Sequence, residues 1–79
     1  MKIFAVIVTF NPNVDVVFNL VQSLKNQKVE IVIVDNNSSN FEKMKSTLFL
    51  TIINLKENFG IAKAQNVGIE YAKKIMLNT

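Results

Sequence analysis

The 79-residue chain contains no cysteine, no histidine and no tryptophan, and it has one proline and two glycines. Without cysteine there is no disulfide, no thiolate nucleophile and no Cys-ligated metal. Without histidine the chain lacks the commonest general base and the commonest transition-metal ligand, and a Ser-His-Asp triad is excluded. Any chemistry therefore rests on carboxylates, amides, hydroxyls, lysines and backbone groups.

Arginine is also absent, so the formal net charge of +3 comes with lysine as the only strong base. The lysines are scattered and are not interleaved with aromatic residues, which is typical of solvated helix faces and not of a nucleic-acid surface. We therefore expect no nucleic-acid partner. The sequence also lacks the Gly-x-Gly-x-x-Gly motif after its first apolar run and any P-loop motif, which disfavours a dinucleotide fold and excludes a P-loop.

No apolar run approaches the roughly 20 residues of a membrane span. The first apolar run is followed by Asn11-Pro12-Asn13 without a small-residue cleavage site, so it does not resemble a signal peptide. We expect a cytoplasmic protein, or one that lies peripherally at the inner face of the membrane.

Three apolar runs rich in β-branched residues predict strands over 3–9, 29–34 and 49–55. Helical spacing predicts helices over 14–27 and 61–76, and a weaker helix within 36–48. This alternation predicts a single α/β unit with a parallel sheet and right-handed crossovers, whose first strand is buried on both faces.

Two details of the helices can be predicted as well. Asn11 followed by Pro12 suggests an N-cap and a first helical position. The last helix carries small residues on its apolar side, so we expect it to lie close to the sheet. The predicted apolar stripes are Val16, Val17, Leu20, Val21 and Leu24 in the first helix, and Ile61, Ala64, Gly68, Ala72 and Ile75 in the last.

Three polar loops leave the carboxyl ends of the predicted strands: TFNPN, DNNSSN and KENFG. Ligands of open α/β sheets bind beyond those ends. Asp35 stands where the second strand reaches this rim. An ionised carboxylate only accepts hydrogen bonds, so it fits a base imide N–H or a sugar hydroxyl. The alternative is that Asp35 caps the next turn through backbone N–H groups.

Other rim residues also carry two interpretations. Thr9 can donate to a base carbonyl or simply end the strand, and Phe10 can stack on a base or pack internally. Gly60 permits a close approach of the protein backbone to a ligand, and the helix N-terminus beside Asn58 and Gly60 favours an anion. Alternatively, Asn58 is an ordinary N-cap. Asn66 is a poor helix former one turn into the last helix, so it faces either water or the rim.

Three segments in order resemble the N-terminal part of family-2 glycosyltransferases of the GT-A fold. They are AVIVTFNPN, IVIVDNNSSN and NLKENFGIAKAQNVGIEYA, the last with Asn58, Gly60, Ala64, Asn66 and Gly68 at the family's spacing. The Phe-Asn-Pro and Asp-Asn-Asn-Ser-Ser variants look most similar to the rhamnosyltransferase-like branch. The resemblance covers nearly the whole chain.

The resemblance implies a three-layer Rossmann-like βαβαβα half-domain over 1–79, with strand order 3-2-1. It implies a UDP- or dTDP-sugar donor and inverting transfer to a saccharide or lipid-linked acceptor, as in cell-surface polysaccharide biosynthesis. Thr9 and Asp35 would contact the base, and the residues that line or support the pocket would be Phe10, Asn11, Asn58, Gly60 and Asn66.

The family's Asp-x-Asp motif, which holds Mn²⁺ or Mg²⁺ in a full-length parent, has no counterpart here, because the only aspartates are Asp15 and Asp35. We therefore expect no cofactor in this chain and no sugar transfer by the chain alone. An expressed fragment, a truncated reading frame and one piece of a split enzyme all fit. We also expect a homo-oligomer formed through the exposed edge of the first strand. The alternative function is a non-catalytic α/β interaction or regulatory module.

Overall fold

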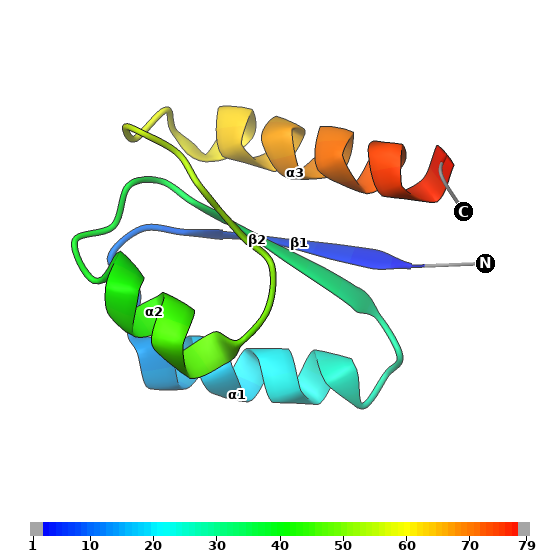
Figure 1. The fold of residues 1–79 in the computed structure, drawn as a ribbon, viewed down its shortest axis with the longest axis horizontal. Coiled ribbons are helices and arrows are strands. Elements are labelled where there is room, and N and C mark those ends of the chain that lie inside the picture. Colours follow the sequence, from blue (N-terminus) through cyan, green and yellow to red (C-terminus); the bar gives the residue numbers. More distant parts are fainter. Residues whose placement is uncertain (1–2, 78–79) are drawn as a thin grey trace.

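The computed structural model describes residues 3–77 and confirms the predicted α/β class. The three strands are β1 (Phe4–Thr9), β2 (Glu30–Asp35) and β3 (Ile52–Asn54), and the three helices are α1 (Val14–Lys25), α2 (Phe41–Leu48) and α3 (Ile61–Leu77). The strands are parallel and lie in the order β1-β2-β3, which is the predicted order. Figure 1 shows α3 on one face of the sheet and α1 with α2 on the other, so the unit has three layers.

The side chains of the sheet alternate between these two layers, and this alternation positions the functional site. Ile33 belongs to the core cluster with residues of α1 and α2, and Ile7 packs against that cluster. Val6 and Val34 lie on the other face, against Gly68 of α3. Because successive side chains of a strand point to opposite faces, Thr9 and Asp35 share the face of α1 and α2. The core cluster consists of Val14, Val17, Val21, Ile33, Met44 and Leu48.

The close approach of α3 to the sheet is confirmed. Its buried residues are Ala64, Gly68 and Ala72, three small side chains on one stripe. A Cβ atom added at Gly68 would lie 2.4 Å from a methyl of Val6 and 3.1 Å from a methyl of Val34. The helix therefore rests its backbone on the two valines, and only glycine fits at the contact.

The predicted N-cap of α1, Asn11, was wrong by two residues. Asn13 is the N-cap, and its Oδ1 accepts the backbone N–H groups of Asp15 at 3.0 Å and Val16 at 3.3 Å. Asn11 has a φ of 45°, a left-handed conformation in which asparagine is one of the few tolerated residues. The chain turns at Asn11 before the helix begins, so Pro12 precedes the cap.

The apolar stripe of α1 is also rotated from the predicted one. Its buried residues are Val14, Val17 and Val21, whereas Val16 and Leu20 are exposed. The helix turns its buried stripe toward α2 and β2, its neighbours in the fold. The flank that carries Val16 and Leu20 remains open to solvent.

Two predictions about the strands need correction. Phe4–Val8 of β1 is only partly buried, because β1 ends the sheet and has a strand on one side only. The third strand is shorter than predicted, Ile52–Asn54. Phe49 adopts a left-handed conformation with a φ of 49° at the end of α2, which turns the chain before strand pairing with β2 can begin.

Within residues 3–77, no helix has both the length and the apolar character needed to cross a membrane.

Candidate functional site at the carboxyl ends of the strands

Asp35, at the end of β2, is the centre of a buried hydrogen-bond network. Its side chain has no exposed surface. Thr9 donates its hydroxyl to Asp35 Oδ1 at 2.7 Å, and the Ser38 hydroxyl donates to the same oxygen at 2.5 Å. The backbone N–H of Ser38 donates to Oδ2 at 2.8 Å. The carboxylate therefore ties the end of β1 to the turn after β2.

The two loops around Asp35 are further joined by the polar residues that follow them. The Asn11 N–H donates to Ser38 Oγ at 2.7 Å, and Asn11 Oδ1 accepts the Ser39 N–H at 2.8 Å. Asn40 Nδ2 donates to the Pro12 carbonyl at 2.8 Å. These contacts fix the β1–α1 loop against the β2–α2 loop, so the left-handed turn at Asn11 has a structural purpose.

A pocket with a volume of about 480 Å³ opens on the other face of the sheet, beside the start of α3. Its size lies within the usual range for small-molecule sites. The pocket collects residues from the ends of β1 and β2 and from the loop that leads into α3. Its lining consists of Val8, Thr9, Phe10, Asn36, Asn58, Gly60 and Ile61.

Asn36 is the most buried polar side chain of this pocket and joins two of its walls. Its Nδ2 donates to the Gly60 carbonyl, and its Oδ1 accepts the Phe59 N–H, both at 3.3 Å. Both hydrogen bonds are long for N–H···O contacts. The Asn36 amide therefore offers the pocket one donor and one acceptor whose existing hydrogen bonds are weak.

Four of the seven residues predicted from the sequence meet in this pocket: Thr9, Phe10, Asn58 and Gly60. Asn58 is not the N-cap of α3, because the helix begins at Ile61. It accepts the Gly60 N–H at 2.9 Å across a tight turn, and Gly60 has a φ of 88°. Glycine is needed at that φ, whereas other residues would be strained there.

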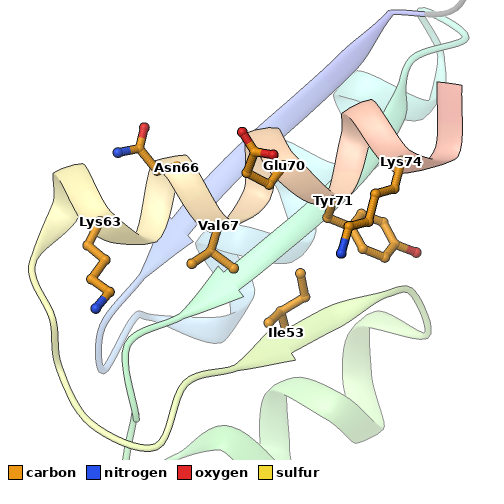
Figure 2. Close-up of a pocket in the computed structure, with 7 residues that line it drawn as sticks. All are labelled: Ile53, Lys63, Asn66, Val67, Glu70, Tyr71 and Lys74. Carbon is orange, nitrogen blue, oxygen red and sulfur yellow. The ribbon is translucent and has the colours of Figure 1, made fainter. Parts of the chain in front are cut away.

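The other three predicted residues lie elsewhere. Asn11 does not line the pocket and joins the β1–α1 and β2–α2 loops through the contacts described above. Asp35 does not line the pocket and accepts a backbone N–H of the following turn, as the capping interpretation of this residue requires. Asn66 lines a separate groove between α3 and β3, and Figure 2 shows its amide directed away from the sheet.

Three lining residues were not predicted: Val8, Asn36 and Ile61. The signal for the first two is the alternation of side chains along a strand. Thr9 and Asp35 are register partners whose side chains are hydrogen-bonded to each other on the face of α1 and α2, although Thr9 also borders the pocket. The preceding and following residues, Val8 and Asn36, therefore point toward α3, where the pocket lies. Ile61 lines the pocket because it is the first residue of α3.

The pocket contains no titratable side chain, so it offers hydrogen bonds and shape but no acid or base. Gly60 and Ile61, at the start of α3, belong to its lining, and the N–H groups of a first helical turn suit an anion. Within residues 3–77, no group of three or more histidine, cysteine, aspartate or glutamate side chains could hold a metal ion. The described residues therefore do not fit a divalent cation.

Comparison with known proteins identifies the family of this chain. The fold is that of an α/β unit with its polar pocket at the strand ends, and the sequence profile of glycosyl transferase family 2 matches residues 4–74. The chain therefore belongs to glycosyl transferase family 2. The resemblance drawn from its three sequence segments is confirmed.

One curated relative shows which branch of the family the chain resembles. The dTDP-rhamnosyl transferase RfbF of Shigella flexneri is 44% identical over 74 residues, which cover 90% of this chain and 25% of the relative. The chain thus spans about a quarter of the length of that protein. No solved structure matches the chain.

Proposed function

We propose that the pocket at the strand ends binds the nucleotide part of a pyrimidine nucleotide-sugar, a dTDP- or UDP-sugar. The observation that supports this most is the set of seven lining residues, which combine apolar walls, one aromatic ring and the Asn36 amide. In the family context, the parent reaction is transfer of that sugar, with inversion, to a saccharide or lipid-linked acceptor. This chain forms the nucleotide-binding half of a GT-A domain in the proposal.

The Asn36 amide suits the edge of a pyrimidine. The imide edge of thymine or uracil presents one N–H between two carbonyl oxygens. The oxygen of an amide side chain can accept that N–H while its NH₂ group donates to one of the carbonyl oxygens. Phe10 is 53% exposed at the mouth of the pocket, so its ring is free to stack on a base. Asp35 then acts as a positioning residue that holds the end of β1, including Thr9, in place.

The diphosphate would lie toward the start of α3. The left-handed Gly60 brings the loop to the helix without a side chain, and nothing lies within 4 Å of where its Cβ would be. Backbone N–H groups of the first helical turn and the positive end of the helix dipole favour an anion there. Asn36 donates to the Gly60 carbonyl, so the base and phosphate ends of the pocket are joined.

We further propose that the 79-residue chain binds the donor without transferring the sugar. A glycosyl transfer needs a base for the acceptor hydroxyl and charge neutralisation at the leaving diphosphate. The lining residues supply neither, and the Mn²⁺ or Mg²⁺ expected in a longer family member would need ligands other than these. A cytoplasmic location and a role in cell-surface polysaccharide synthesis complete the proposal.

Phe10 gives a test of the pocket that leaves the fold intact. We expect Phe10→Ala to weaken dTDP or UDP binding by about tenfold, since loss of a base–aromatic stack costs about 1 to 3 kcal/mol. Phe49→Ala is the matched control, because Phe49 is 83% exposed and lies outside the pocket. Isothermal titration calorimetry on the unmodified chain and both variants measures this. Equal loss in both variants, or no binding to the unmodified chain at millimolar nucleotide, would favour a non-catalytic interaction module.

We also propose that the chain forms a homo-oligomer through the free edge of β1. This strand ends the sheet, and an open strand edge offers unpaired N–H and C=O groups. Ile69 is exposed on the flank of α3 opposite Val67 and Tyr71, so it stands on the β1 side. Pairing β1 with β1 of a second copy would cover both the edge and this flank. Multi-angle light scattering at micromolar concentration should give a dimer that Ile69→Lys weakens, and a monomer for the unmodified chain contradicts the proposal.

A further inference from the structure

A second concavity lies between α3 and β3, away from the strand-end pocket. This groove has a volume of about 740 Å³ and is lined by Ile53, Lys63, Asn66, Val67, Glu70, Tyr71 and Lys74. None of these residues lines the strand-end pocket. Figure 2 shows the side chain of Ile53 rising from β3 toward Val67 and Tyr71 of α3. The floor of the groove is therefore apolar and joins two elements.

The ends of the groove carry positive charge. Lys63 and Lys74 extend from α3 on the same side as Val67 and Tyr71 (Figure 2). Lys63 Nζ lies 4.3 Å from the centre of the Phe59 ring, so its charge already has an aromatic partner. Lys74 lies at the other end beside Tyr71, which offers a hydroxyl.

The one acidic residue of the groove does not cancel this charge. Glu70 lies 3.5 Å from Lys73 in an exposed ion pair, so its carboxylate is directed to a lysine outside the groove. Val67 and Lys74 are seven residues apart on one helix, which separates them by about 10 Å along the axis. An apolar floor of that length ending at a lysine and a phenol matches an elongated apolar molecule with an anionic end.

We propose that the groove between α3 and β3 binds a single-chain amphiphile with an anionic head group. The alkyl chain lies on Ile53, Val67 and the Tyr71 ring, which removes its apolar surface from water. The head group, a phosphate or a carboxylate, accepts hydrogen bonds from Lys74 and the Tyr71 hydroxyl. The site is separate from the nucleotide pocket and does not depend on it.

Four probes with the same alkyl chain test the chemistry of the site. Decyl phosphate and decanoate are the anionic probes, decanol is neutral and decyltrimethylammonium is cationic. Each is titrated below its micelle-forming concentration into the ¹⁵N-labelled chain, with chemical shifts followed by residue. We expect the anionic probes to shift Ile53, Val67, Tyr71 and Lys74, and stronger binding of one of them identifies the head group.

Two variants and their matched controls locate the site. Lys74→Glu and Val67→Glu should each weaken decyl phosphate binding by about tenfold, a difference of about 1.4 kcal/mol. Lys43→Glu, on α2, makes the same charge reversal elsewhere. Ala62→Glu places the same acid at an exposed position of α3 outside the groove. Both controls should leave the affinity within about twofold.

Different results would overturn the choice of head group and the groove itself. Circular dichroism of each variant tests whether its helices are kept, so that a loss of binding reports on the groove. Equal affinity of decanol or decyltrimethylammonium overturns the anionic head-group site. Unchanged binding by Val67→Glu, or no residue-specific shifts with any probe, overturns the groove itself.

Discussion

Replacement of Asp35 by alanine is expected to lower the free energy of unfolding by about 3 kcal/mol, because three buried donors lose their acceptor. Those donors are the Thr9 hydroxyl, the Ser38 hydroxyl and the Ser38 N–H. A domain of this size has a total stability of about 4 to 12 kcal/mol. The variant is therefore expected to be marginal, and Asp35→Asn, which keeps the shape and one acceptor oxygen, should lose about half as much.

Urea unfolding followed by circular dichroism measures this effect. Asp15→Ala is the matched control, since Asp15 lies in the exposed first turn of α1, where its interaction with the helix dipole contributes about 0.5 kcal/mol. An Asp35→Ala variant as stable as the Asp15→Ala variant would contradict the role given to the network.

Replacement of Gly68 by valine is expected to destabilise the chain by about 3 kcal/mol or more, and replacement by alanine by about 1 to 2 kcal/mol. An alanine Cβ would meet the Val6 methyl at 2.4 Å, so either α3 or Val6 must move. Alanine gains about 1 kcal/mol of helix propensity over glycine, which offsets part of the overpacking. Valine adds two further methyl groups to the same contact.

A double-mutant cycle shows whether the contact with Val6 causes the loss. In a Val6→Ala background both Val6 methyl groups are gone, including the one at 2.4 Å, and Gly68→Ala should lose most of its cost. Ala62→Val, at an exposed position of α3, controls for valine propensity and should cost well under about 1 kcal/mol. If Gly68→Ala costs the same in both backgrounds, the packing of α3 on β1 is not as described.

Much of the fold follows from periodicity in the sequence. The β-branched runs predict all three strands, and the small residues Ala64, Gly68 and Ala72 predict the close helix. Local turns are harder, because two asparagines compete for the cap of α1. Asn11 and Asn13 are equally good N-caps by type, and only the left-handed turn at Asn11 decides between them.

The candidate site was predicted by location but only partly by residue. Loops at the carboxyl ends of parallel strands meet at one edge, so Thr9, Phe10, Asn58 and Gly60 are brought together. By residue type Asp35 can be either a ligand contact or the cap of the next turn, and the strand's alternation directs Asp35 to one face and Asn36 to the other. Which face holds the pocket depends on where α3 packs, and that is a tertiary property.

The most direct measurement of the central claim is titration of the ¹⁵N-labelled chain with dTDP, followed by residue-resolved chemical shifts. We predict that the largest shifts fall on the lining of the strand-end pocket, including Phe10, the Asn36 side-chain amide and Gly60. The groove residues Tyr71 and Lys74 should not move. Shifts confined to other surfaces, or none at saturating nucleotide, would contradict the assignment of this pocket to a nucleotide-sugar.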